Sequence, residues 1–165
     1  MSNLYDLTPV SEGYQFTNNS GDQYYVYLTA YSLLDPLLQG EEAYVNVYML
    51  GFNCKRAKPE DPFGYDANTK HTIISIFKSL LDQFNEEAFL YICDNKDGRA
   101  RNRRITFGRW FNEANDGYEH HHSHFKYGSE DWYSAIIVKK DKPDKQFYID
   151  AYHFTLAQIL NGYDE

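Results

Sequence analysis

The first third of the chain alternates apolar and polar positions, as half-buried β-strands do. Residues 14–17 and 23–31 both alternate, and the turn-forming run Asn18-Asn19-Ser20-Gly21-Asp22 separates them, so they predict a β-hairpin. Residues 43–52 alternate again and predict a third strand. Residues 33–39 contain Pro36 and predict at most one turn of helix.

The middle of the chain changes to a helical period. Apolar residues three and four positions apart predict a helix that begins at Asn68 or Thr69 and ends near Phe84. The next apolar run, residues 89–93, is continuous, which is typical of a strand buried on both faces in the centre of a sheet. Residues 99–114 then predict a second helix.

The last third predicts a polar loop over residues 115–131, strands over 133–139 and 146–149, and a short closing helix over 152–160. The fold class predicted from the whole pattern is α+β, as one domain over residues 1–165. A mixed or largely antiparallel sheet of about six strands packs on two main helices, in the order βββ-α-β-α-ββ-α.

Composition excludes several classes of protein. Hydrophobic residues make up 42% of the 165 residues and charged residues 24%, so the chain is not disordered. The net charge of −8 argues against general nucleic-acid binding and against binding to anionic membranes. The 16 tyrosines and 11 phenylalanines favour strands and suit a surface that contacts another protein.

The N-terminal residues and the cysteines predict a cytoplasmic protein. Residues 1–6 have neither the basic nor the apolar region of a signal peptide, and no apolar run approaches the roughly 20 residues that span a bilayer. Cys54 and Cys93 form neither a disulfide framework nor a zinc pattern. Cys93 ends an apolar run and is interpreted as a buried thiol at a strand end.

Positive charge is concentrated in one segment. Residues 96–109 carry six basic residues and one acidic residue, a local charge of +5, and hold five of the six arginines of the chain. On a helix, Arg103 falls in the middle of the apolar stripe, where a guanidinium must be paired or must line a cavity. The candidate residues for binding an anion are Asp94, Asp97, Arg99, Arg101, Arg103 and Arg104.

Three interpretations of this segment stay open. The first is a structural network in which Asp94 and Asp97 pair with the arginines. The second is a phosphate or nucleotide site, because a strand end, the turn at Gly98 and a helix N-terminus with arginines can hold an anion. The third is a basic docking surface for an acidic partner.

Four of the six histidines lie in the run Glu119-His120-His121-His122-Ser123-His124. In an extended chain His120, His122 and His124 share one face, and three imidazoles could hold zinc or nickel. The alternative is a solvated loop with incidental affinity for metals, in which case the protein has no cofactor.

Several short patterns together resemble an uncharacterised bacterial family defined by a domain of unknown function. They are Tyr14-x-Phe16, Tyr25-Val26, Thr72-Ile73-Ile74, Cys93-Asp94-x-x-Asp97-Gly98-Arg99, Arg101-x-Arg103 and Arg109-Trp110-Phe111. The resemblance extends from about Tyr14 to Ile149 and implies a bacterial cytosolic protein without an assigned reaction.

The leading hypothesis is a non-enzymatic protein-interaction module, as antitoxins and immunity proteins are. The acidic charge, the many tyrosines and the lack of recognisable catalytic motifs favour it. Binding of phosphate or a nucleotide by residues 94–104, and of a metal by residues 120–124, are the alternatives. The expected partner is another protein, and the oligomeric state is left open.

Overall fold

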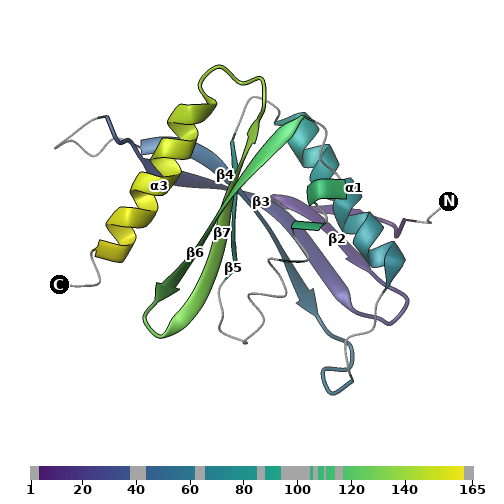
Figure 1. Ribbon diagram of the computed structural model, residues 1–165. Helices are drawn as coiled ribbons and strands as arrows, with labels where there is room; N and C mark the ends of the chain where they lie inside the picture. The colour runs from purple at the N-terminus through teal and green to yellow at the C-terminus, as the bar shows by residue number, and fades with distance from the viewer. Residues whose placement is uncertain are drawn as a thin grey trace.

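The computed structural model describes residues 4–37, 44–61, 66–84, 88–93, 105, 108–109, 111–113 and 117–161. Its described strands form one seven-stranded sheet with the order β1-β2-β3-β4-β5-β7-β6 (Figure 1). The strands are β1 (Thr8–Val10), β2 (Gly13–Thr17), β3 (Gln23–Leu34), β4 (Tyr44–Lys55), β5 (Phe89–Cys93), β6 (Tyr118–Tyr127) and β7 (Glu130–Lys139). The pair β4–β5 is parallel and the other pairs are antiparallel, so the sheet is mixed.

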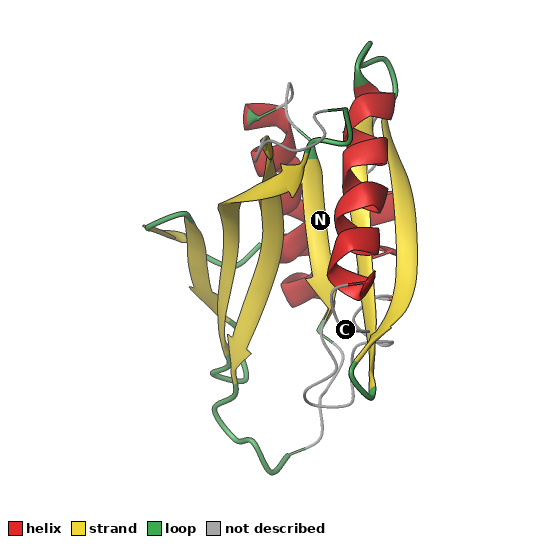
Figure 2. Cartoon of the chain, turned by 90° about the vertical axis from the view of Figure 1, so that its left-hand side faces the viewer, coloured by secondary structure: helices red, strands yellow, loops and turns green. Residues whose placement is uncertain are grey.

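Two long helices cover opposite faces of this sheet: α1 (Ala67–Gln83) and α3 (Lys145–Asn161) (Figures 1 and 2). The apolar residues accordingly form two clusters. One contains Ile73, Ile76 and Phe77 of α1, and the other contains Ile149 and Tyr152 of α3. Strands that contribute to both clusters are buried on both sides, and the fold is α+β with a helix on each face.

The central strand β5 shows how the sequence pattern produces this arrangement. Phe89, Tyr91 and Cys93 belong to the cluster under α1, whereas Leu90, between them, belongs to the cluster under α3. Because successive side chains point to opposite faces, a strand covered on both sides must be apolar throughout. The prediction of a central strand over residues 89–93 is therefore confirmed, and Cys93 is buried at its end.

Helix α1 is confirmed, although it begins earlier than predicted. Its N-cap is Asp66, whose carboxylate accepts hydrogen bonds from the backbone N–H groups of Asn68 and Thr69. The same carboxylate accepts a hydrogen bond from the Tyr5 hydroxyl at 2.7 Å, which attaches the N-terminal segment to the helix. In the predicted helix 99–114, the described residues from Ile105 to Glu113 are helical, and Phe111 joins the cluster under α1.

The predicted polar loop over residues 115–131 is wrong, because most of it is strand β6. Strand β6 pairs with β7 without interruption, from Tyr118 opposite Lys139 to Tyr127 opposite Glu130. The two strands are joined by Gly128 and Ser129, and Gly128 has a φ of +66°, which suits a tight hairpin turn. The prediction was wrong because the histidines of this segment count as polar. They hide the alternation of side chains that places Phe125 and Tyr127 on one face of the strand.

The predicted strand over residues 146–149 is also wrong, because these residues form the first turns of α3. Phe147, Tyr148 and Ile149 favour strands by propensity, but Ile149, Tyr152 and Thr155 are buried at helical spacing against the sheet. The sheet also gains β1, so it has seven strands instead of about six. No described helix is long and apolar enough to cross a membrane.

Candidate functional site

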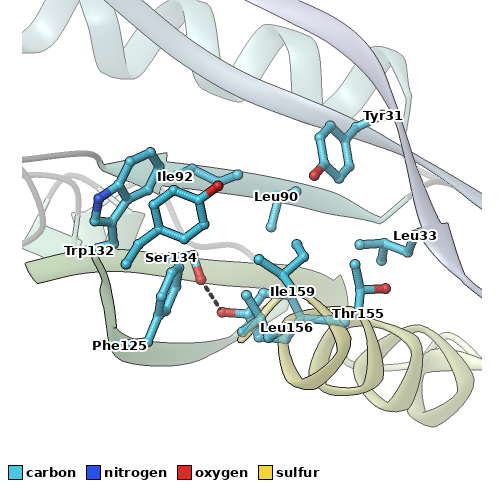
Figure 3. Close-up of a pocket in the computed structure, with 12 residues that line it drawn as sticks. Tyr31, Leu33, Leu90, Ile92, Phe125, Trp132, Ser134, Thr155, Leu156 and Ile159 are labelled. Carbon is cyan, nitrogen blue, oxygen red and sulfur yellow. Dashed lines mark hydrogen bonds between the residues drawn. The ribbon is translucent and has the colours of Figure 1, made fainter. Parts of the chain in front are cut away.

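An apolar pocket of about 210 Å³ lies between α3 and the face of the sheet that α3 covers (Figure 3). We call it the α3 pocket. Strands β3, β5, β6 and β7 supply one side and α3 supplies the other. It is lined by Tyr31, Leu33, Leu90, Ile92, Phe125, Tyr127, Trp132, Ser134, Tyr152, Thr155, Leu156 and Ile159.

Exposure separates the floor of the α3 pocket from its mouth. Leu33, Leu90, Ser134, Tyr152 and Thr155 are each at most 7% exposed and form the floor. The mouth carries two aliphatic side chains that are open to solvent, Ile92 on β5 at 37% and Ile159 on α3 at 36%. The aromatic side chains of Phe125, Tyr127 and Trp132 on the β6–β7 hairpin are half-buried beside them.

The floor contains polar atoms that bond one another. The hydroxyls of Ser134 and Tyr152 lie 2.5 Å apart (Figure 3). Thr155 accepts a hydrogen bond from the backbone N–H of Leu34 at 2.8 Å and donates one to the carbonyl of Ala151 at 2.7 Å. Burial raises the pKa of the Tyr152 phenol above its ordinary value of 10.0, because the ionised form is poorly solvated there.

Charged side chains at the edge of the sheet attach strand β6 to helix α3. The carboxylate of Glu119 accepts a hydrogen bond from the Lys145 ammonium at 3.1 Å and lies 3.0 Å from the ring of His121. The hydrogen bond with His121, followed by that with Lys145, lowers the pKa of Glu119 below 4.5. The contact between Lys145 and Glu119 joins the start of α3 to the start of β6.

The histidine run occupies both faces of β6. His121 faces α3, whereas His120, His122 and His124 face the other way, as predicted for an extended chain. His120 contacts the hydroxyl of Tyr91 at 2.8 Å, and its ring centroid lies 4.0 Å from that of His122.

His124, the third predicted ligand, lies 3.0 Å from the carboxylate of Asp131 and stacks on Tyr133. Within the described ranges, no three histidine, cysteine, aspartate or glutamate side chains are grouped as metal ligands would be. Metal binding by His120, His122 and His124 stays a prediction.

The candidate anion-binding residues Asp94, Asp97, Arg99, Arg101, Arg103 and Arg104 all lie outside the described residues. Both the structural network and the anion site therefore stay predictions. Arg109, at the end of the same basic segment, is described and is exposed.

Sequence reasoning missed the α3 pocket as a site. Its residues come from five elements, and none of them belongs to a catalytic or ligand-binding motif. The usable signal was the pair of aromatic residues on one face of β6, Phe125 and Tyr127, opposite Trp132 on β7. It became visible only with the correct assignment of β6 as a strand.

Fold and site together define a mixed α+β protein with an apolar pocket under its C-terminal helix. The family of unknown function DUF6169 matches residues 65–153, more than half of the chain, and the chain belongs to this family. The match extends from the start of α1 into α3 and includes seven of the twelve lining residues, from Leu90 to Tyr152. It confirms the resemblance to a domain-of-unknown-function family. No curated protein and no solved structure matches the chain.

Proposed function

We propose that the protein is a non-enzymatic interaction module that binds a partner protein by accepting one apolar side chain of that partner in the α3 pocket. The observation that carries this proposal is the size and lining of the pocket. Antitoxins and immunity proteins, which act by binding another protein, are the functional class expected from the acidic composition.

The volume of the α3 pocket favours a single side chain as its occupant. A dry cavity of about 150 Å³ is sufficient to hold one benzene ring. Pockets that enclose drug-sized ligands measure about 300 Å³ or more. At about 210 Å³, the α3 pocket lies between these values, and it suits one large aliphatic or aromatic side chain.

The mouth of the pocket has the composition of a protein-binding surface. Ile92 and Ile159 expose more than a third of their surface, and three aromatic side chains of the β6–β7 hairpin stand beside them. Burying one leucine or phenylalanine of a partner contributes about 1.5 to 3 kcal/mol. A few such anchoring residues dominate the affinity of typical protein interfaces.

The polar groups of the floor favour binding over catalysis. A general acid or base must present an available proton donor or acceptor to its substrate. In the floor, Ser134 bonds Tyr152, and the hydroxyl of Thr155 bonds two backbone groups.

The proposal is tested by capture of partners from the native host with wild-type protein and two charged variants. Ile159→Lys places a cation at the mouth of the pocket, and lysine is tolerated in the last turn of a helix. Leu7→Lys is the matched control, because Leu7 is 41% exposed and does not line the pocket. We expect a stoichiometric partner that Ile159→Lys loses and Leu7→Lys retains. Equal capture by both variants, or no stoichiometric partner for the wild type, would contradict the proposal.

A further inference from the structure

We infer that strand β6 pairs with strand β6 of a second copy of the chain, in antiparallel orientation and about a twofold axis at Ser123, so that two sheets become one. The pairing uses the outer backbone edge of β6, whereas the proposed function uses the interior of the α3 pocket. The inference is argued from the edges of the described sheet, the direction of the backbone groups of β6 and the order of its side chains.

The two edges of the described sheet differ in length and in protection. Strand β1 forms one edge, has three residues and contains Pro9, which has no N–H group to donate. Strand β6 forms the other edge (Figure 1), has ten residues without proline and pairs with β7 without a bulge. Natural proteins protect their sheet edges with short strands, prolines, charges or bulges, because a long and regular edge pairs with other strands. The edge at β6 is therefore the one suited to strand addition.

The two charged side chains of β6 do not protect this edge. Lys126 lies directly opposite Asp131 on β7, so its positive charge has an acidic neighbour on the same face of the sheet. The carboxylate of Glu119 lies 3.1 Å from the ammonium of Lys145. Neither side chain brings an uncompensated charge to an approaching strand.

The backbone groups of β6 that point away from β7 belong to the even-numbered residues. At one end of the hairpin, the N–H of Lys140 donates to the carbonyl of Gly117 at 2.8 Å. At the other end, Tyr127 and Glu130 flank the two-residue loop as a pair in the same phase. Because hydrogen-bonded and non-hydrogen-bonded pairs alternate along an antiparallel ladder, the odd-numbered residues of β6 bond β7. The N–H and carbonyl groups of the even-numbered residues point to the outer edge.

This phase limits how a second copy of β6 can pair. Outward-pointing residues must oppose outward-pointing residues, so the twofold axis passes through a residue rather than between two residues. Ser123 lies near the middle of β6 and has its smallest side chain. On the axis, the two copies of Ser123 would form a non-hydrogen-bonded pair with Cα atoms about 4.5 Å apart. His122 of each copy then lies opposite His124 of the other, and both residues are exposed.

The pairing is self-complementary and ends at two copies. Lys126 lies opposite His120 of the other copy, and Glu119 lies opposite Tyr127, so lysine does not face lysine and glutamate does not face glutamate. The joined sheet has only the two β1 edges, which are short and contain Pro9. The expected assembly is therefore a closed dimer rather than a fibre.

The oligomeric state of the full chain, measured by size-exclusion chromatography with light scattering, tests the inference with two substitutions at one position. His122→Pro removes an N–H group that points outward, and proline is tolerated at such edge positions. His122→Ala keeps the N–H group and is the matched control. We expect the mass of two chains for the wild type and His122→Ala, and the mass of one chain with an unchanged circular dichroism spectrum for His122→Pro. A wild type with any other mass, or equal masses for the two variants, would overturn the inference.

Single cysteines test the register, and they serve if His122→Pro does not fold. Ser123→Cys places two thiols opposite each other on the axis, at a Cα separation that suits a disulfide. Lys126→Cys is the control, because Lys126 is exposed and its copy lies several residues away along the strand. After oxidation we expect a disulfide-linked dimer of Ser123→Cys on a non-reducing gel, and monomers of Lys126→Cys and of the wild type, which contains Cys54 and Cys93. Equal crosslinking of the two variants, or none, would overturn the inference.

Discussion

The hydroxyl oxygens of Ser134 on β7 and Tyr152 on α3 lie 2.5 Å apart, and both side chains are almost completely buried. This contact joins the C-terminal helix to strand β7 at the floor of the α3 pocket. It is one of the polar contacts between α3 and the sheet, together with the hydrogen bond from the Leu34 N–H to Thr155 and that from Lys145 to Glu119.

Tyr152→Phe should lower the free energy of unfolding by about 1 to 2 kcal/mol, because it removes the hydrogen-bond partner of the buried Ser134 hydroxyl. The control is Tyr25→Phe, since Tyr25 donates to the carbonyl of Ser11 at 2.7 Å in an exposed position. Water replaces that bond, and the loss should be below about 0.5 kcal/mol. Urea unfolding monitored by circular dichroism measures both values, and a larger loss for Tyr25→Phe would contradict the role given to the buried pair.

Asp66 stabilises the start of α1 and the N-terminal segment together. Its carboxylate accepts the N–H groups of Asn68 and Thr69 and the hydroxyls of Thr69 and Tyr5. Asp66→Ala should therefore cost about 2 kcal/mol of unfolding free energy. Within the part of the chain that the structure describes, Asp35 bonds only the nearby N–H of Leu37 in an exposed turn, so Asp35→Ala should change stability by less than about 0.5 kcal/mol. Equal losses in thermal or urea unfolding would show that the cap is not the cause.

Stability should fall in acid through Asp66 and Glu119. Burial alone would raise the pKa of Asp66, but hydrogen bonds from Thr69, Tyr5 and two backbone groups outweigh it and hold the pKa below 3.8. His121 and Lys145 lower that of Glu119 below 4.5. A native pKa below the unfolded value means that the unfolded chain takes up protons first, so this stability is present above the ordinary values and is lost as pH falls through the native ones.

In Asp66→Asn one of these carboxylates is absent. Its unfolding free energy should therefore decline less steeply than that of the wild type between about pH 5 and pH 2. Urea titrations at several pH values measure the two slopes. Parallel curves over the whole range would contradict the assignment of this acid sensitivity to Asp66.

Two glycine substitutions should have opposite effects. Gly13 lies in β2 where the backbone of β3 comes so close that a Cβ atom would overlap the carbonyl oxygen of Val26. Gly13→Ala should therefore cost about 3 kcal/mol. Gly108 is helical with open space around it, so Gly108→Ala should be neutral or should stabilise by up to about 1 kcal/mol. Melting temperatures of both variants check the prediction, which fails if Gly13→Ala is tolerated.

Elements with a single dominant period could be predicted from the sequence. The hairpin β2–β3, strand β4, helix α1 and the central strand β5 follow from period-two alternation, a capped helical stripe and a continuous apolar run. Strand β6 could not be predicted, because its histidines count as polar and hide the alternation of a strand. The first turns of α3 could not be predicted either, because Phe147, Tyr148 and Ile149 have the composition of a strand. In both places packing against the rest of the sheet decides the conformation.

The candidate site was predictable to a smaller extent. That His120, His122 and His124 share one face follows from strand geometry and is confirmed. The α3 pocket could not be predicted, because it is assembled from side chains on five separate elements, and each of them in isolation is indistinguishable from an ordinary core or surface residue.

The most direct test of the central claim is the response of the methyl groups to xenon. Xenon enters dry apolar cavities of this size and perturbs only the side chains that line them. In methyl-labelled protein under xenon pressure, we expect the resonances of Leu33, Leu90, Leu156 and Ile159 to shift and saturate together, whereas those of Leu7 and Leu37 stay in place. Shifts that are equal at all six residues, or absent from the four pocket residues, would contradict the presence of an apolar binding site under α3.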